Sequence, residues 1–590
     1  MIKFRKFILG LLIVLLVLSG LSQFSTAQKK RAVGDLKAVE KNGVLRAGKG
    51  WTQEIEGLKI AYYSGSPREI GRQHGLLLID EPEKMKKVLL SLDPSQQAEG
   101  IFEKTAWLFK NLYARYKFYP DFKRHTRDEY LEEMKGFVEG ASRGKESGIY
   151  EVMMGTASQD ISLAGPACSA TAAWGTATKD GEMYVGRNLD HKGLIDLAEY
   201  QHIAFYNPDS GQQFVVHNYP SFVGTMSGMN ESGIIISSNY SISIEEEITI
   251  NGLPYMLMLR EILQYAKDLD EALEIIRKTP RTIGLNLMLT SAKEDKAVVV
   301  ELTAHHMHVR ESNNSYIFTS NMFQNKKMKK FQDVGWLSSA LRDRRFKELN
   351  KKYFGKIDEK IMRNIMRDKF DPKQPAGKGL YSGINSENNL ASMVFAPGKE
   401  KLWLGIPIKE GLSPYSADGK FIEIDAGQVW KKGNPLQRYN ILASTEWEGH
   451  ALDWLKVRDA EVLIEERKNK KALKILKEIL ADNPKAAYPQ LMAGRAHNRL
   501  GNYEKGLSYL KRFIGQPEHP EPYRLLQARF WSGLINDILG RRNKALNNYR
   551  KALEVEIEDL ASDSDMFNIW AEKGLKSPLG INENGEVIVK

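Results

Sequence analysis

The sequence predicts an α+β domain of antiparallel sheets and helices, followed by an all-α domain. Between residues 169 and 319, short apolar runs of strand length alternate with turn signals such as Asp180-Gly181, which is typical of β-hairpins. Between residues 58 and 160, and again beyond Asp453, apolar residues recur at helical spacing. With 590 residues and an apolar fraction of 42%, the chain can form two or three domains.

The N-terminus has the pattern of a signal peptide over residues 1–27. A basic start (Lys3, Arg5 and Lys6) precedes the apolar run Ile8–Leu21, and small residues end at Ala27. We therefore expect export to the periplasm or the extracellular space. The apolar run is shorter than the ~20 residues of a membrane-spanning helix, so no stable membrane span is expected after signal cleavage. An uncleaved anchor is the alternative.

Charge and motifs exclude several classes of partner. The 85 basic and 74 acidic residues leave a net charge of 85 − 74 = +11, and the basic residues are scattered among acidic ones. There is no arginine-rich stripe or nucleic-acid motif, so no nucleic-acid partner is expected. His305, His306 and His308 lie on a predicted strand without a carboxylate in register, so we expect no metal site. No cofactor is expected either.

The C-terminal part contains three similar helical segments. They start at Ala472, Gly506 and Ala545, so the two offsets are 506 − 472 = 34 and 545 − 506 = 39. A period of ~34 residues is typical of tetratricopeptide repeats, although the second offset requires a short insertion. We predict repeats over residues 453–556, which could bind a protein partner, and a tail over 557–590. An ordinary helical domain is the alternative.

Cys168 is the only cysteine of the chain, so no intramolecular disulfide can form. A lone cysteine is most often a small buried apolar residue, but the residues around this one change that interpretation. A predicted hairpin follows it directly and ends in Gly186-Arg187-Asn188-Leu189-Asp190. Earlier in the chain stands the phrase Ser66-Pro67-Arg68-Glu69-Ile70-Gly71-Arg72-Gln73-His74-Gly75.

These blocks resemble the cysteine N-terminal nucleophile hydrolases over about residues 58–410. The more specific resemblance is to the acyl-coenzyme A:6-aminopenicillanate acyltransferase family, peptidase family C45. It implies a four-layer αββα fold for the first domain. It also implies a helical pro-segment over residues 28–167 and a catalytic chain over 168–440, separated by self-cleavage between Ala167 and Cys168.

The chemistry of such a site explains why one cysteine is sufficient. The Cys168 thiol would attack the carbonyl of Ala167, and water would hydrolyse the resulting thioester. The freed α-amino group has an ordinary pKa of ~7.7–8.0, close to the pH at which a general base works well. One residue would then supply both nucleophile and base. The family usually has glycine at the position of Ala167.

The resemblance assigns roles to four further residues. Asp190 would hold the new amine, and Arg187 would orient Asp190 or the thiolate, since a nearby cation lowers a thiol's pKa. Asn239 would donate to the oxyanion, and Asn321 would align the amine or the substrate carbonyl. Surface ion pairing and turn or cap roles are the alternatives. The family's late arginine is missing near 384–386, and Arg342 on a predicted helix is a doubtful substitute.

These residues predict hydrolysis or transfer of an acyl group through a Cys168 thioester. The expected substrates are small non-peptide amides: N-acyl amines, N-acyl amino acids or β-lactam side chains. Two other functions stay open. The chain could be a non-enzymatic adaptor with a relic hydrolase domain, or a peptidase or phospholipase-like enzyme on the same fold. Substrate choice depends on pocket shape, which no motif encodes.

Overall fold

The computed structural model describes most of the chain. The described residues are 32–33, 36–78, 114–142, 148–161, 168–191, 200–333, 337–368, 383–386, 389–406, 417, 419–442, 456–457, 459–461, 463–464, 467–482, 484, 486–516, 522–555, 562–582 and 587–589. The predicted signal peptide and Ala167 lie outside these ranges, as do residues 79–113 of the segment with helical spacing.

The larger of two central sheets has twelve strands, in the order β1-β2-β3-β4-β5-β8-β9-β10-β11-β12-β13-β14. Only the β5–β8 pair is parallel. The strands are β1 (Ala32–Val33), β2 (Leu36–Lys41), β3 (Val44–Ala47), β4 (Gly50–Ile55), β5 (Leu58–Gly65), β8 (His202–Pro208), β9 (Phe214–Asn218), β10 (Ser227–Asn230), β11 (Ile234–Tyr240), β12 (Leu285–Ser291), β13 (Lys296–Leu302) and β14 (Met307–Arg310).

The second sheet has seven antiparallel strands in the order β15-β6-β7-β16-β17-β18-β19. These are β15 (Tyr316–Thr319), β6 (Ser169–Gly175), β7 (Gly181–Asp190), β16 (Asn389–Ala396), β17 (Lys401–Gly405), β18 (Phe421–Asp425) and β19 (Asn440–Leu442). The hairpin predicted after Cys168 is β6–β7. Gly181, the first residue of β7 directly after the turn, has φ +79°, a conformation that glycine adopts without strain.

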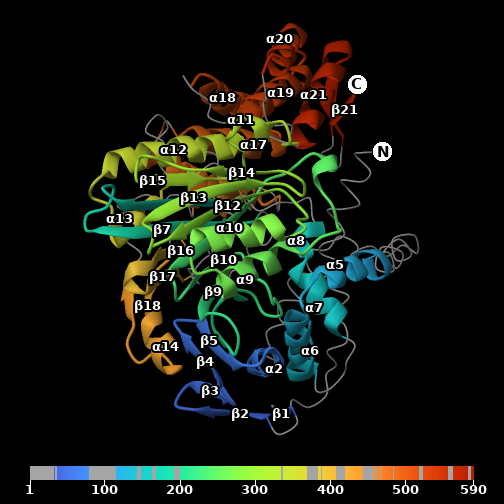
Figure 1. Cartoon of the computed structure of the whole chain (residues 1–590). Helices are drawn as coiled ribbons and strands as arrows, with labels where there is room; N and C mark the ends of the chain where they lie inside the picture. The colour runs from blue at the N-terminus through green and yellow to red at the C-terminus, as the bar shows by residue number, and fades with distance from the viewer. Residues whose placement is uncertain are drawn as a thin grey trace.

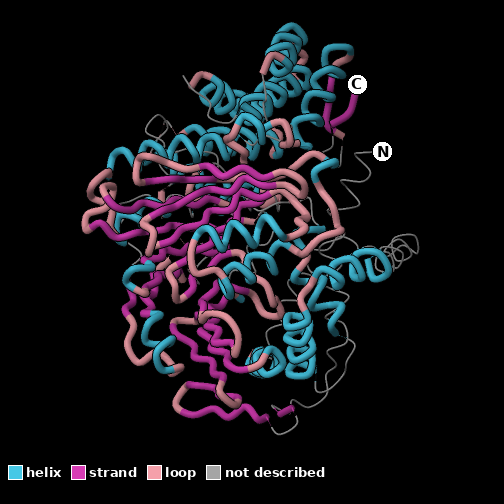
Figure 2. Tube along the Cα trace, in the orientation of Figure 1, coloured by secondary structure: helices cyan, strands magenta, loops and turns pink. Residues whose placement is uncertain are grey.

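The two sheets pack face to face and helices cover their outer sides, which makes four layers (Figures 1 and 2). α9 (Tyr255–Tyr265) and α10 (Leu269–Lys278) cover strands β10–β12 of the larger sheet. α12 (Leu337–Tyr353) and α13 (Glu359–Met366) cover β6, β7, β15 and β16 of the smaller one. This is the αββα arrangement that the resemblance implied.

The segment before Cys168 differs from the predicted helical pro-segment. Residues 36–65 form β2–β5 and extend the larger sheet, where β5 pairs with the sequence-distant strand β8. The turns between these strands contain Gly43 at φ +73° and Gly57 at φ +82°. Asn42-Gly43 and Glu56-Gly57 are therefore hairpin signals that the sequence analysis missed. The helices of this segment are α2 (Pro67–Leu77), α5 (Tyr119–His125), α6 (Asp128–Ser142), α7 (Ile149–Thr156) and α8 (Ser158–Ile161).

The phrase Ser66–Gly75 forms the N-cap and most of α2, which crosses α6 at close range. Ser66 caps α2 in a capping box with Glu69. A Cβ on Gly71 would lie 2.0 Å from the Glu133 carbonyl oxygen, and one on Gly75 would lie 2.2 Å from that of Phe137. The absence of side chains at both positions allows the two helix backbones to touch.

We therefore expect Gly71→Ala to destabilise the fold by about 2–3 kcal/mol or more, because neither backbone can yield. Gly155→Ala is the matched control. Gly155 also lies in a helix, but its added Cβ would meet Phe222 at an ordinary 3.6 Å, so the higher helix propensity of alanine should dominate. Denaturant unfolding of both variants measures the difference. Equal stability of the two would contradict the close crossing.

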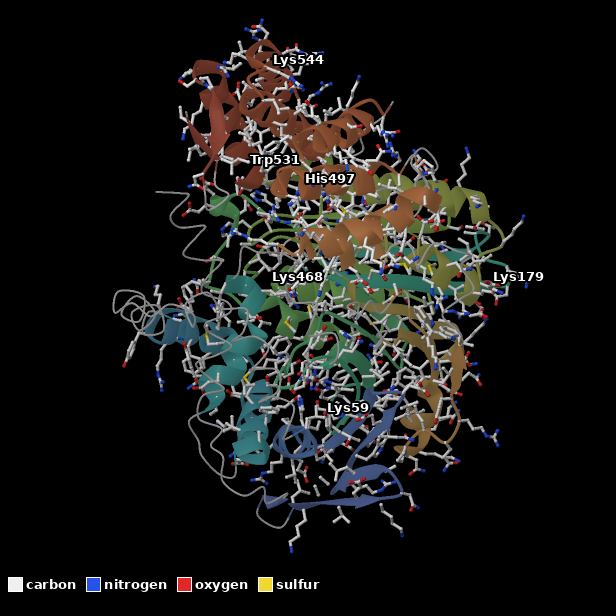
Figure 3. All side chains as sticks on the ribbon, turned by 180° about the vertical axis from the view of Figure 1, so that it is seen from behind. Lys59, Lys179, Lys468, His497, Trp531 and Lys544 are labelled. Carbon is white, nitrogen blue, oxygen red and sulfur yellow. The ribbon has the colours of Figure 1, made fainter. Side chains whose placement is uncertain are left out.

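The C-terminal part forms consecutive helices above the sheets in Figure 1, in orange and red. They are α16 (Asn469–Asp482), α17 (Ala487–Arg499), α18 (Tyr503–Ile514), α19 (Pro522–Ile538) and α20 (Arg542–Leu553). Ala472, Gly506 and Ala545 are each the fourth residue of their helix and are buried. The three segments are thus structurally equivalent, while their assignment to the tetratricopeptide class stays a prediction. Figure 3 labels His497 and Trp531 on α17 and α19 of this array.

The region predicted as a tail contains a packed element. α21 (Ser562–Lys576) and the hairpin β20 (Leu579–Ile581)–β21 (Val587–Val589) follow the repeats. Phe567, Ala571 and Leu579 are buried against α19 and α20, so these residues close the apolar end of the array. Among the described residues, no helix combines the length and apolar character needed to cross a membrane.

Candidate functional site

Cys168 lies directly before β6, deep inside the first domain. Its side chain is fully buried, and its sulfur lies 3.8 Å from the main-chain oxygen of Asp190 at the end of β7. β6 pairs with β7 on one side and with β15 on the other. The end of β7, with Asp190, and the end of β15, which Asn321 closely follows, therefore both lie beside the start of β6 at Cys168.

Arg187 connects the two sheets beside Cys168. From β7 it reaches across to the larger sheet, where its Nε donates to Ser227 Oγ at 3.2 Å and its Nη1 donates to Asn239 Oδ1. The Nδ2 of Asn239 donates to the main-chain oxygen of Thr319 at 3.2 Å. All these side chains are buried. Arg187 and Asn239 thus form one hydrogen-bonded pair that joins the two sheets.

Arg342 forms a second buried arginine–asparagine pair, which corrects the expectation that it is a doubtful participant. From α12 it donates through Nη1 to the main-chain oxygen of Cys168 and through Nη2 to Asn321 Oδ1 at 2.9 Å. Asn321 Nδ2 donates to the main-chain oxygen of Tyr240 at 2.7 Å. A buried guanidinium thus reaches Cys168 from α12, which comes earlier in the chain than residues 384–386, where an arginine was expected.

Asp190 lies at the end of β7 next to Asn389, the first residue of β16. Asn389 Nδ2 donates to Asp190 Oδ1 at 3.0 Å. The other carboxylate oxygen, Oδ2, is buried and has no hydrogen-bond partner among the described residues, and the same holds for Nη2 of Arg187. Buried polar groups are rarely left unsatisfied, so these two atoms mark where further polar groups can bind.

Burial and charge act in opposite directions on the titratable groups. Burial raises the pKa of the Cys168 thiol, while Arg187 opposes this increase and Asp190 adds to it. Burial also raises the pKa of Asp190 to about 7, against the attraction of Arg342, the Asn389 hydrogen bond and the attraction of Arg187. The site therefore contains the guanidinium groups of Arg187 and Arg342 together with the carboxyl group of Asp190. Of these three groups, the carboxyl group is the one that can gain or lose a proton near neutral pH.

Three aromatic or imidazole side chains surround this site that the sequence analysis did not identify. Burial raises the pKa of both Tyr219 and Tyr255, and the nearby Cys168 adds to the increase in each case. His217 packs edge-on against Tyr219, and its pKa falls to about 3, chiefly because it is buried. His217 is therefore a neutral imidazole next to Tyr219. No sequence motif marks these residues, since they come from β9, its following loop and the start of α9.

Two of the three histidines considered for a metal site, His306 and His308, have other side-chain partners. His306 Nδ1 lies 2.9 Å from a carboxylate oxygen of Glu247, and His308 Nε2 lies 2.8 Å from Asn325 Nδ2. The expectation that no carboxylate lies in register was wrong, because Glu301 of β13 stands opposite His308 of β14. His305 and His306 precede β14, and Glu247 reaches His306 from the short helix Glu245–Glu247. Over the described ranges, no group of three or more potential ligands could hold a metal ion.

A stability measurement tests the environment of Asp190. A carboxyl group with a raised folded-state pKa favours folding below its unfolded pKa, and this contribution is lost as pH rises through the window from about 4 to 7. Asp190→Asn avoids this loss. In a Cys168→Ala background, we expect the asparagine variant to be more stable at pH 8, by up to about 4 kcal/mol, and to lose that advantage at pH 4. Parallel pH-dependence in both proteins would contradict the buried carboxyl.

The model of the acyl-coenzyme A:6-aminopenicillanic acid acyl-transferase family matches residues 176–408. This part of the chain is therefore similar to that family. The matched segment starts shortly after Cys168 and contains Arg187, Asp190, Asn239 and Asn321. It also contains α12 with Arg342, so the helix that supplies the second arginine lies within the matched segment. The C-terminal helices lie outside the match.

Three relatives share parts of the chain. An uncharacterized protein of Archaeoglobus fulgidus is 25% identical over 285 residues, which cover 43% of this chain and 45% of the relative. Protein dcd1B of Dictyostelium discoideum is 31% identical over 138 residues, covering 23% and 27%. Protein dcd1A of the same organism is 26% identical over 196 residues, covering 32% and 43%. The chain therefore spans less than half the length of each.

Two solved structures show weaker similarity. A Caenorhabditis elegans ortholog of N-acylethanolamine-hydrolyzing acid amidase has a TM-score of 0.30 at 18% identity, covering 39% of this chain and 93% of that one. A mutant of conjugated bile acid hydrolase from Clostridium perfringens has a TM-score of 0.32 at 16% identity, covering 46% and 96%.

Proposed function

We propose that this protein is a cysteine amidohydrolase or acyltransferase that activates itself by cleavage before Cys168. One observation carries the proposal: the buried thiol of the only cysteine lies at the start of a strand, beside a carboxylate whose Oδ2 has no partner among the described residues. That oxygen can accept a hydrogen bond from the α-amino group that cleavage would create. The similarity of residues 176–408 to an acyl-transferase family supports the same chemistry.

The first step would produce the amine. The thiol attacks the carbonyl carbon of Ala167, the C–N bond breaks, and the peptide nitrogen takes up the thiol proton as the acyl group moves to sulfur. Water then hydrolyses this thioester and leaves a carboxylate on Ala167 and a free amino group on Cys168. Arg342 holds the main-chain oxygen of Cys168, so the nucleophile keeps its position after the peptide bond is cut.

The second reaction would use that amine as a general base. The amine accepts the thiol proton, and sulfur attacks the carbonyl of a substrate amide. The leaving nitrogen takes the proton back, and an acyl-thioester remains on Cys168 until water or an acceptor amine removes the acyl group. The amide groups of Asn239 and Asn321 lie on either side of the site, where one N–H could stabilise the oxyanion.

The two chains formed by cleavage should stay together. β5 pairs with β8 across the cleavage point. Glu133 in α6 forms a buried ion pair with Arg260 in α9, with 2.8 Å between Oε2 and Nη2. Breaking such a buried pair leaves an uncompensated charge and is strongly unfavourable. We therefore expect the chains to co-elute in size exclusion and to separate only in denaturant.

The test of the proposed reaction is a substrate panel together with mass spectrometry of the adduct. Processed protein is incubated with N-acyl amines, N-acyl amino acids and β-lactams, then quenched. The expected result is release of the amine, and an acyl mass on the chain that begins at Cys168, which hydroxylamine removes. Cleavage of peptides or phospholipids instead would support the alternative hydrolases. No turnover and no adduct with any of these compounds would favour the adaptor.

Export is proposed separately from the chemistry. The pattern of residues 1–27 predicts a mature N-terminus at Gln28. Mass spectrometry of protein secreted by a host with a matching export system checks this directly. A retained N-terminal segment would indicate the uncleaved anchor.

A further inference from the structure

The first residue of β16, Asn389, reaches Asp190 because the strand contains an irregularity. Ala391 pairs with Leu189 and Ser392 with Asn188, but the register shifts between Ala391 and Asn389, so that Asn389 pairs with Asp190. Without the extra residue, Leu390 would stand opposite Asp190. Since a shift of one residue moves a side chain to the other face of a sheet, the irregularity replaces an apolar neighbour of the carboxylate with an amide.

The amide of Asn389 can take only one orientation. Its Oδ1 accepts a hydrogen bond from the main-chain N–H of Ala417 at 3.0 Å, and its Nδ2 donates to the main-chain oxygen of Ala391 at 3.1 Å. A flipped amide would place oxygen against oxygen and nitrogen against N–H. The remaining hydrogen of Nδ2 therefore points at Asp190 Oδ1, and both side chains are fully buried.

We propose that Asn389 is a positioning residue that holds Oδ1 of Asp190 and thereby presents Oδ2 to the amino group of processed Cys168. This inference rests on the proposed function. The side chain of Asn389 forms its hydrogen bonds with Asp190, Ala391 and Ala417, so it would act on the thiol through the carboxylate. It supplies a donor that stabilises the ionised carboxylate, and it fixes the plane of that carboxylate so that the amine's lone pair faces the thiol.

Other charged groups around Asp190 set the background for a test. Arg342 approaches from α12, Arg187 extends from the same strand, and Cys168 lies at the start of β6. All three remain in a protein that lacks only the Asn389 amide. Loss of the amide should therefore raise the pKa of Asp190 from about 7 by roughly one to two units, since a hydrogen bond to a charged group is stronger than a neutral one.

The direct experiment measures that titration without any turnover. The carboxyl ¹³C signal of Asp190 is followed from pH 4 to 9 in Cys168→Ala protein, with and without Asn389→Leu. Asn188→Leu is the matched control. Asn188 is equally buried on β7, and its Nδ2 donates to the main-chain oxygens of Met366 and Ile384, both at 2.8 Å, rather than to Asp190. We expect an upward shift for Asn389→Leu only. Equal titration in all three proteins would overturn the proposal.

A kinetic experiment tests the same point in the processed enzyme. The acidic limb of the kcat pH profile should move up by about one unit in Asn389→Leu, with kcat at pH 7 falling roughly tenfold and KM unchanged. If Asn389→Leu does not fold, Asn389→Ala, which introduces less bulk, replaces it in both experiments. A rise in KM with an unchanged limb would assign Asn389 to substrate binding instead, and would overturn the positioning role.

The outcomes separate this inference from the proposed function. One outcome is that the wild type is processed and active while Asn389→Leu changes neither the acidic limb of the kcat pH profile nor the pKa of Asp190. In that case the Asn389 proposal fails and the proposed function stands. If the wild type is never processed and has no substrate, the proposed function fails and the presentation of Oδ2 to an amine fails with it. The titration then still decides whether Asn389 stabilises the ionised carboxylate.

Discussion

Purified wild-type protein should contain a chain that begins at Cys168 and ends at Lys590, whereas Cys168→Ala should remain one uncut chain. No other thiol exists in the sequence, and an alanine methyl group cannot accept the acyl group of Ala167. The expected effect is complete loss of cleavage rather than a slower rate. Intact-mass spectrometry of both proteins measures it.

Ser169→Ala is the control for this experiment. Ser169 is adjacent to the cysteine and fully buried, and its hydroxyl has no hydrogen-bond partner among the described residues, so it is the nearest rival nucleophile. We expect Ser169→Ala to be cleaved like the wild type. An uncut wild-type chain would remove self-activation from the proposal and make the adaptor the leading interpretation. Cleavage of Cys168→Ala would move the nucleophile elsewhere.

Arg342→Met should reduce turnover by roughly 10²–10³-fold, on the scale of losing one positioned donor in a buried site. The arginine holds both the main-chain oxygen of Cys168 and the side chain of Asn321. Its loss would release two parts of the site at once. It would also remove the largest attraction that keeps the pKa of Asp190 down. Steady-state kinetics of processed protein checks this.

Arg342→Lys should not restore activity, because a single ammonium group cannot reproduce the fork of donors that reaches two acceptors. Arg345→Met serves as the control for damage to α12. Arg345 lies one turn further along that helix and pairs with Asp368 at 2.8 Å, away from Cys168. We expect it to lower the unfolding temperature with little change in kcat. Equal kcat losses in the two methionine variants would show that helix packing, and not the site, explains the effect.

The local elements of the first domain could be predicted because their signals are local. The β6–β7 hairpin and helices α9 and α10 follow from turn residues and apolar spacing between near neighbours in the sequence. The strands before α2 were missed because helical spacing further along dominated that region. Pairing between strands as far apart in the chain as β5 and β8 has no signal in the neighbouring sequence.

The site was partly predictable for the same reason. Arg187 and Asp190 belong to one short block after Cys168, and Asn239 and Asn321 each lie at or just after the end of a recognisable strand. Arg342 and Asn389 have no such context. Arg342 is one of several cations on α12, and only the packing of that helix over β6 points it at Cys168. The position of Asn389 opposite Asp190 depends on a register shift in β16, and no residue pattern in the sequence predicts that shift.

The sequence by itself determined which chemistry this protein can offer: a single thiol at the start of a strand, with an arginine and a carboxylate placed at the end of the next strand by hairpin geometry. Only the tertiary structure decided how that chemistry is surrounded. Two sheets and one helix bring arginine–asparagine pairs to both sides of the cysteine, and an irregular strand adds an amide to the carboxylate. The physical reason is the distance along the chain between the interacting residues. The pairing of two strands in a hairpin depends on residues close together in the sequence, whereas burial depends on segments far apart in the chain.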